Sequence, residues 1–154
     1  MVSDKIILGI DPGTIIMGYG LVHIRNKNIE LINFGIIKLA QYQSHQDKLK
    51  KIFERITELI TEYKPDEISI EAPFFGKNVQ SMLKLGRAQG VAMAAALNKN
   101  IPVFEKKVVR STTSGPDDPF LIGNVCFLPL LLSINVTVSF SIIITNYAVT
   151  FPKI

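Results

Sequence analysis

Charged residues stop abruptly about two thirds of the way along this chain, and that change limits what the chain can fold into. Of its 154 residues, the first 110 carry 16 of the 17 lysines and arginines and 11 of the 13 aspartates and glutamates. From Pro119 to Pro152 there is no charged side chain at all. Only the first part mixes charged and apolar residues in the periodic way that predicts helices and strands. We therefore expect one α/β domain over residues 1–105 and a different kind of sequence over 106–154.

Composition excludes several classes of protein. Hydrophobic residues make up 47% of the chain and charged residues 19%, which excludes global disorder. The single cysteine, Cys126, excludes a disulfide scaffold and a cysteine-based zinc site. A net charge of +4 points only mildly to a polyanionic partner. The N-terminus lacks the basic-then-apolar pattern of a signal peptide, so we expect a cytoplasmic location and no membrane partner.

Short apolar runs bounded by turn residues predict five strands. The first three are separated by short polar turns and predict an antiparallel meander, whereas the later two are separated by helical patterns. The resulting β-β-β-α-β-α-β order predicts an α/β fold with a mixed sheet flanked by helices, its later strands parallel. The predicted strands are residues 6–10, 18–25, 29–38, 67–71 and 101–105.

Two segments show the spacing of helices. Apolar residues recur at helical intervals from Leu49 to Tyr63, after Ser44 and Asp47, which resemble a capping box. A second helix is predicted over residues 81–98. Its Gly86, Gly90 and Ala94 form a small-residue stripe, and because glycine disfavours a helix, we expect the stripe to permit close packing against the sheet or a partner helix.

Two acidic residues lie at the ends of predicted strands that are far apart in the sequence. Asp11 follows the first strand, and Glu71 ends the fourth. Functional side chains gather beyond the carboxyl ends of such strands, so the two carboxylates face each other if their strands are parallel neighbours. A close pair of carboxylates shares a proton or holds a cation such as Mg²⁺, which supports phosphodiester hydrolysis. The alternative is that each acid only caps a turn or a helix.

A glycine-rich turn, Asp11-Pro12-Gly13-Thr14, begins at the first of these acids, and Gly18-Tyr19-Gly20 follows it. Glycines at a strand end allow positive φ angles and let a phosphate approach the backbone. A similar turn begins the phosphate loops of actin-like and sugar kinases, so an ATPase fragment is a further interpretation. Those proteins close two lobes around ATP, and a chain of this length does not supply both.

Aromatic and basic residues follow Glu71, and they suit contact with DNA. Paired aromatics on a loop stack on unpaired bases, while nearby cations hold phosphates. The alternative is that one phenylalanine anchors the loop in the core and that the cations lie on a solvated helix face. His23 and His45 are isolated, and we predict neither to be catalytic. The candidate DNA-binding residues are Phe74, Phe75, Lys77, Asn78, Lys84 and Arg87.

Taken together, these motifs resemble one known family. Over residues 5–105 the chain resembles RuvC, the bacterial Holliday junction resolvases. The most specific part is the block Ser81-Met82-Leu83-Lys84-Leu85-Gly86-Arg87-Ala88-Gln89-Gly90. The rest of the resemblance is carried by Gly9-Ile10-Asp11-Pro12-Gly13-Thr14, Gly18-Tyr19-Gly20, Ile70-Glu71, Phe74 and Lys77-Asn78.

The resemblance implies a ribonuclease H-like fold and a Mg²⁺-dependent endonuclease, with two ions per subunit in the intact family site. It implies a homodimer whose subunits each make one of two symmetric nicks in a four-way DNA junction, in partnership with a branch-migration helicase complex. Asp11 and Glu71 match the family's catalytic metal ligands, and Phe74 matches the aromatic that stacks at the opened junction. Lys77 and Asn78 match the loop that approaches DNA.

The chain departs from the family pattern after Glu105, where family members continue with a basic segment and helices. The last of those helices supplies two further ligands, whereas here only the adjacent Asp117 and Asp118 remain, beside prolines that disfavour a helix. Residues 120–151 are long enough to cross a bilayer, but Pro129 and polar residues interrupt them. We favour a reading-frame change near codon 106 over a membrane anchor or a buried sheet.

The sequence therefore predicts two alternative functions. The first is a Holliday junction resolvase whose C-terminal helical portion is replaced by an atypical apolar tail. The second is a catalytically inactive junction- or DNA-binding remnant. Because Asp11 and Glu71 are half of the ligand set that the resemblance implies, we expect weak or no cleavage by the chain as it stands.

Overall fold

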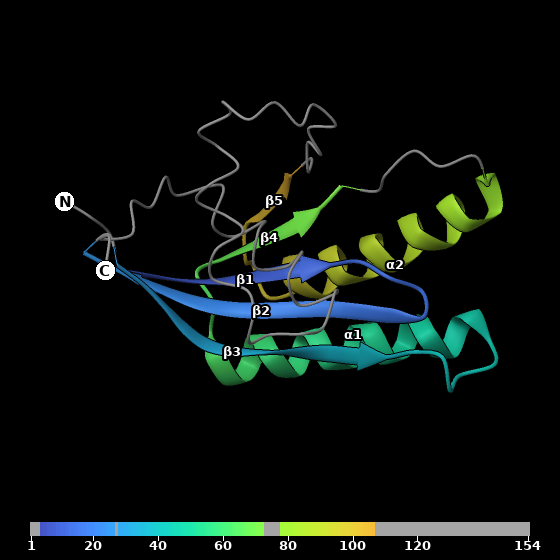
Figure 1. Ribbon diagram of the computed structural model, residues 1–154, viewed down its shortest axis with the longest axis horizontal. Helices are drawn as coiled ribbons and strands as arrows, with labels where there is room; N and C mark the ends of the chain where they lie inside the picture. Colours follow the sequence, from blue (N-terminus) through green and yellow to red (C-terminus); the bar gives the residue numbers. More distant parts are fainter. Residues whose placement is uncertain (1–3, 27, 73–77, 107–154) are drawn as a thin grey trace, which may run out of the picture.

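The structure is a computed structural model that describes residues 4–26, 28–72 and 78–106 (Figure 1). One five-stranded mixed sheet has the strand order β3-β2-β1-β4-β5, and two helices connect its later strands. The predicted α/β class and element order are confirmed. The elements are β1 (Lys5–Asp11), β2 (Ile16–Arg25), β3 (Asn28–Lys38), α1 (His45–Tyr63), β4 (Glu67–Glu71), α2 (Val79–Leu97) and β5 (Val103–Lys106).

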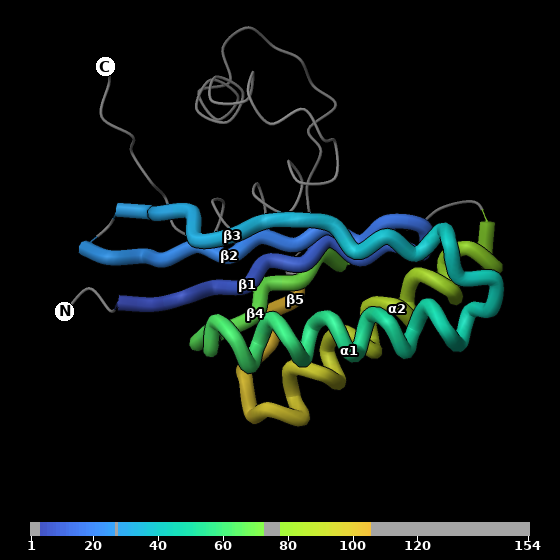
Figure 2. The backbone as a smooth tube through the Cα atoms, turned by 90° about the horizontal axis from the view of Figure 1, so that it is seen from below, coloured from blue at the N-terminus to red at the C-terminus, as the bar shows by residue number. Residues whose placement is uncertain are grey.

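Both helices cover the same face of the sheet (Figure 2). Strands β1, β2 and β3 pair antiparallel, whereas β4 pairs parallel with β1 on one side and with β5 on the other. Parallel neighbours need a crossover connection, and α1 and α2 provide the two crossovers, into β4 and into β5. Figure 1 shows that the carboxyl ends of β1 and β4 lie at the end of the sheet where both helices begin.

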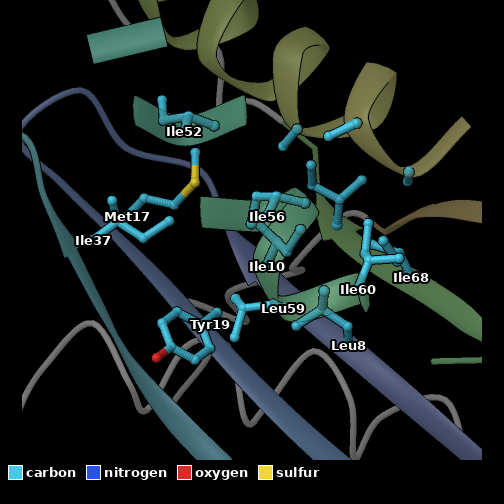
Figure 3. Close-up of a cluster of buried hydrophobic side chains, with 14 of the residues drawn as sticks. Leu8, Ile10, Met17, Tyr19, Ile37, Ile52, Ile56, Leu59, Ile60 and Ile68 are labelled. Atoms are coloured by element: carbon cyan, nitrogen blue, oxygen red, sulfur yellow. The ribbon is translucent and has the colours of Figure 1, made fainter. Parts of the chain in front are cut away.

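The hydrophobic core lies between the sheet and the helices. Leu8 and Ile10 of β1 and Ile68 of β4 point toward α1, where Ile56 and Leu59 meet them (Figure 3). All five side chains are fully buried. Because strand side chains alternate between faces, this core leaves the residues in between on the opposite face of the sheet.

The start of α1 follows the predicted cap. The Ser44 side chain accepts a hydrogen bond from the Asp47 backbone N–H at 3.0 Å, and Ser44 Oγ donates to the Asp47 carboxylate at 2.6 Å. At the other end, Lys64 has a left-handed backbone with φ 47°, and its N–H bonds to the carbonyl of Ile60. Both ends of this helix are therefore fixed locally, and the N-terminal cap is the one that the sequence predicts.

Several predicted boundaries differ from the structure, and strand β2 begins at Ile16 rather than at Gly18. Helix α2 begins two residues earlier than expected, because Asn78 caps it by accepting from the Ser81 N–H at 3.1 Å. Strand β5 begins at Val103 rather than at Ile101. The Ile101 N–H bonds to the carbonyl of Ala96 at 3.1 Å, so this residue belongs to the turn that leaves α2.

The packing of α2 corrects part of the small-residue prediction. Its buried residues are alanines and one glutamine, namely Ala88, Gln89, Ala92, Ala95 and Ala96. A Cβ added at Gly86 or Gly90 would meet nothing within 4 Å, so neither glycine is needed for packing against the sheet. Contact of this stripe with a partner helix stays a prediction.

The predicted tail lies outside the described residues, apart from Lys106 at the end of β5. The frame change, the membrane anchor, the buried sheet and a ligand role for Asp117 or Asp118 are therefore untested. Within the described ranges, neither helix is long and apolar enough to span a membrane.

Candidate active site at the carboxyl ends of β1 and β4

Asp11 and Glu71 occupy equivalent ends of neighbouring strands. Strands β1 and β4 are parallel, and Ile10 pairs in register with Ile70, so the acid that follows each isoleucine ends its strand. The structure thus meets the condition set for the predicted carboxylate pair, that these two strands are parallel neighbours. Because Ile10 and Ile70 are buried in the core beneath the helices, the alternation of side chains directs Asp11 and Glu71 to the opposite face.

The Glu71 carboxylate has the properties of a cation ligand. Its Oε2 atom is buried and has no hydrogen-bond partner among the residues that the structure describes. A buried acceptor left unsatisfied costs about 1–3 kcal/mol, and more when it is charged. Two half-buried carboxylates on one face supply the hard oxygen ligands that Mg²⁺ prefers, so the residues present fit the ion.

A buried glutamine fixes the end of β4. The Gln89 side chain is 6% exposed and donates from Nε2 to the backbone carbonyl of Glu71 at 3.2 Å. This bond joins α2 to the residue that carries the second carboxylate. The residues described include no group of three or more metal-ligating side chains, so this part of the site consists of two acids.

The turn after Asp11 needs its glycine for a different reason from the one predicted. A Cβ at Gly13 would lie 1.7 Å from the carbonyl oxygen of Ile16, so any other residue would force the turn open. None of the described glycines has a positive φ, so the predicted conformational role was wrong. On β2, Gly18 pairs with Asp11, and no β2 side chain stands beside the carboxylate at this register position.

The candidate DNA-binding residues fall into three groups. Lys84 and Arg87 are exposed on α2, and within the described ranges neither makes an ion pair. Asn78 uses its side-chain oxygen to cap α2, so it has a structural role whether or not it contacts DNA. Phe74, Phe75 and Lys77 lie outside the described residues.

The two histidines lie in different environments. His23 on β2 pairs with Asp4, away from the carboxyl ends of β1 and β4. His45 begins α1, and burial lowers its pKa below the usual value, with further lowering by Arg87, Lys84 and Lys48. Its Nε2 atom is buried and has no hydrogen-bond partner in the described part of the chain.

Two residues near the site were missed by the sequence analysis. Gln89 was quoted only as part of a motif, although a polar residue among the alanines of α2 signals a buried hydrogen bond. Lys48 donates from Nζ to the carbonyl of Thr14 at 3.1 Å and so joins α1 to the turn after Asp11. No sequence signal predicts that contact, because it joins residues 34 positions apart.

Comparison with known proteins identifies the family. The family model described as crossover junction endodeoxyribonuclease RuvC matches residues 7–115. The chain belongs to the RuvC family. The match extends ten residues beyond Glu105, so the resemblance continues further than the sequence analysis predicted.

Curated members of the RuvC family are similar to the chain over most of its length. The crossover junction endodeoxyribonuclease RuvC of Cytophaga hutchinsonii is 63% identical over 113 residues, which are 71% of this chain and 56% of the relative. The proteins of the same name from Christiangramia forsetii and Porphyromonas gingivalis are 60% and 59% identical, over 72% and 70% of this chain and 59% and 57% of the relatives. The chain therefore spans somewhat more than half the length of these relatives.

Solved RuvC structures confirm the ribonuclease H-like fold. A Thermus thermophilus RuvC in complex with a Holliday junction substrate has a TM-score of 0.63 and 23% sequence identity, over 66% of this chain and 65% of that one. A second Thermus thermophilus RuvC structure has a TM-score of 0.60 and 25% identity, over 66% of this chain and 63% of the other.

Proposed function

We propose that residues 1–105 are the nuclease domain of a Holliday junction resolvase, an endonuclease that nicks four-way DNA junctions in recombination and repair. The observation that carries the proposal is the pair of acids, Asp11 and Glu71, on parallel neighbouring strands in a RuvC-family chain. The Thermus thermophilus relative that binds a Holliday junction supports the choice of substrate.

In this proposal Asp11 and Glu71 hold Mg²⁺, with two ions per subunit once the missing ligands are present. When bound, the metal activates water and stabilises the oxygens of the phosphodiester that is cut. The chain's own residues set the geometry. The Gln89 bond to the Glu71 carbonyl fixes one acid, and the tight turn at Gly13 fixes the backbone after the other.

DNA contact is assigned to residues around this end of the sheet. Lys84 and Arg87 supply exposed positive charge for backbone phosphates. Phe74 and Phe75 are proposed to stack on unpaired bases, and Lys77 and Asn78 to approach the DNA from the same loop.

The outer face of α2 supports a homodimer. Val79, Leu83 and Leu97 are 67%, 56% and 58% exposed and apolar. With the small residues Gly86, Gly90 and Ala94 they fall three or four residues apart, as on the seam of two packed helices. We assign this face to contact with a second copy of the chain. We also propose that the dimer acts in the cytoplasm with a branch-migration helicase complex as its partner.

The test compares this chain with a chimera in which the residues after 115 are those of the Cytophaga hutchinsonii relative. We expect both to bind a four-way junction and the chimera alone to cut it efficiently with Mg²⁺. Asp11→Asn in the chimera abolishes nicking but retains binding. Equal cutting by the original chain would contradict the ligand-set argument and exclude the inactive-remnant alternative. A chimera that binds junctions and never cuts them would overturn the proposed function.

A further inference from the structure

Four basic side chains from two helices lie on the helix-covered side of the sheet, and three of them are close enough to the fourth, His45, to lower its pKa. His45 and Lys48 belong to the first turn of α1, and Lys84 and Arg87 to the first half of α2. The two helices pack against each other and begin at the same end of the sheet (Figure 1). Lys84 and Arg87 are exposed, whereas His45 and Lys48 are half-buried.

The positive charge of this cluster is not balanced within the described part of the chain. No described carboxylate forms an ion pair with Lys48, Lys84 or Arg87. The nearest acid in sequence, Asp47, is engaged by Ser44 in the cap of α1. The N-terminus of α1 adds partial positive charge at the same place. An anion is therefore the ligand that this cluster favours.

His45 provides a second, independent observation. Its buried Nε2 has no hydrogen-bond partner among the described residues, although buried polar atoms of proteins are nearly always paired. The three cations around it favour the neutral ring, which carries one N–H donor. An anion bound between the two helices would accept that hydrogen bond. Its negative charge would offset the three cations around the ring.

We propose that His45, Lys48, Lys84 and Arg87 form a second phosphate site, which holds a DNA backbone phosphate away from the bond that is cut. The inference rests on the proposed DNA substrate. In this site Arg87 and Lys84 form charge-assisted hydrogen bonds with the phosphate, and the His45 ring donates a hydrogen bond to it from the base of the site. Lys48, which also holds the Thr14 carbonyl, connects the site to the turn that follows Asp11.

The first test follows the two histidines by NMR, in the full chain and without divalent metal. We expect inorganic phosphate and a short DNA duplex each to raise the pKa of His45 and shift its ring signals. The signals of His23, which pairs with Asp4 on β2, are the internal control and do not move. A chain that binds DNA while its His45 signals stay unchanged would overturn the inference. A response to inorganic phosphate alone would also overturn it.

The second test measures junction binding by fluorescence anisotropy, again without metal. One phosphate contact contributes a salt slope of about 0.9, so Arg87→Gln or Lys84→Gln weakens binding about eightfold at about 0.1 M salt and reduces the slope by about 0.9. His45→Ala weakens it about fivefold, as expected for one hydrogen bond. The matched controls Lys99→Gln, an exposed cation beyond the other end of α2, and His23→Ala leave it unchanged.

These outcomes separate the inference from the proposed function. Wild-type affinity in Arg87→Gln, Lys84→Gln and His45→Ala would overturn the second phosphate site and the assignment of Lys84 and Arg87 to DNA contact. It would leave the nuclease role of Asp11 and Glu71 standing. No binding of junctions by the wild-type chain would overturn the proposed function and, with it, the DNA phosphate site.

Discussion

Replacement of Glu71 by glutamine separates the stability of the candidate site from its function. Without a divalent cation, the buried Oε2 of Glu71 has no hydrogen-bond partner among the described residues. Because the side chain as a whole is half-buried, we take the lower end of the usual penalty, about 1 kcal/mol. Glu71→Gln removes the charge and keeps the shape, although one polar amide atom stays unpaired there, so in EDTA it raises the Tm by at most about 4–8 °C for a domain of this size.

Mg²⁺ reverses the order of the two Tm values, so that the wild type melts above Glu71→Gln. A site with a Kd of about 1 mM gains about 1.4 kcal/mol of stability at about 10 mM Mg²⁺, and Glu71→Gln gains none. The wild-type Tm therefore rises by about 6–11 °C, while that of the variant does not change. Differential scanning fluorimetry in EDTA and in Mg²⁺ measures both effects.

Glu67 supplies the matched control for this experiment. It lies on the same face of β4 as Glu71, but its Oε2 pairs with Lys5 Nζ at 2.8 Å. Glu67→Gln should therefore be slightly less stable than the wild type in both buffers and should keep the full response to Mg²⁺. The reasoning is refuted by a Glu71→Gln variant that melts below the wild type in EDTA, or that responds to Mg²⁺ as the wild type does.

Three further predictions concern the helices. Ser44→Ala removes the cap of α1 and lowers the free energy of unfolding by about 1 kcal/mol in urea denaturation, whereas an unchanged value would contradict the capping role. The depressed pKa of His45 means that the unfolded chain binds more protons, so stability falls as pH drops below about 6.5 toward the folded-state pKa. His45→Gln should flatten that part of the pH profile, and an equally steep profile would refute the assignment. Leu83→Glu on the outer face of α2 should give a monomer in analytical ultracentrifugation where the wild type is a dimer, and a dimeric variant would exclude this interface.

The elements that were predictable from the sequence are those whose signals are local. The cap at Ser44 and the apolar spacing of α1 lie within one segment of chain, and the structure reproduces both. The apolar runs of β1 and β4 predict two strands, but their adjacency came from the ribonuclease H-like fold that the family resemblance implies, and the structure confirms it. The pairing of Asp11 with Glu71 therefore depended on the resemblance as well as on the strand pattern.

The parts that were not predictable depend on contacts between distant segments. The need for Gly13 comes from the close approach of the Ile16 carbonyl rather than from its own dihedral angles. Lys48 reaches Thr14, and Gln89 reaches Glu71, only because α1 and α2 lie against the same sheet. The cluster around His45 likewise combines residues of two helices. In the sequence, the basic residues of either helix alone are typical of a solvent-exposed face.

Binding of Mn²⁺, followed by electron paramagnetic resonance of the free ion, tests most directly whether Asp11 and Glu71 act as one cation site. The wild-type chain and Glu67→Gln should bind Mn²⁺ equally well. Asp11→Asn and Glu71→Gln should each lose that binding, and the double variant should lose no more than either single one. Wild-type Mn²⁺ affinity in either single variant would contradict the account, however similar the chain is to its relatives.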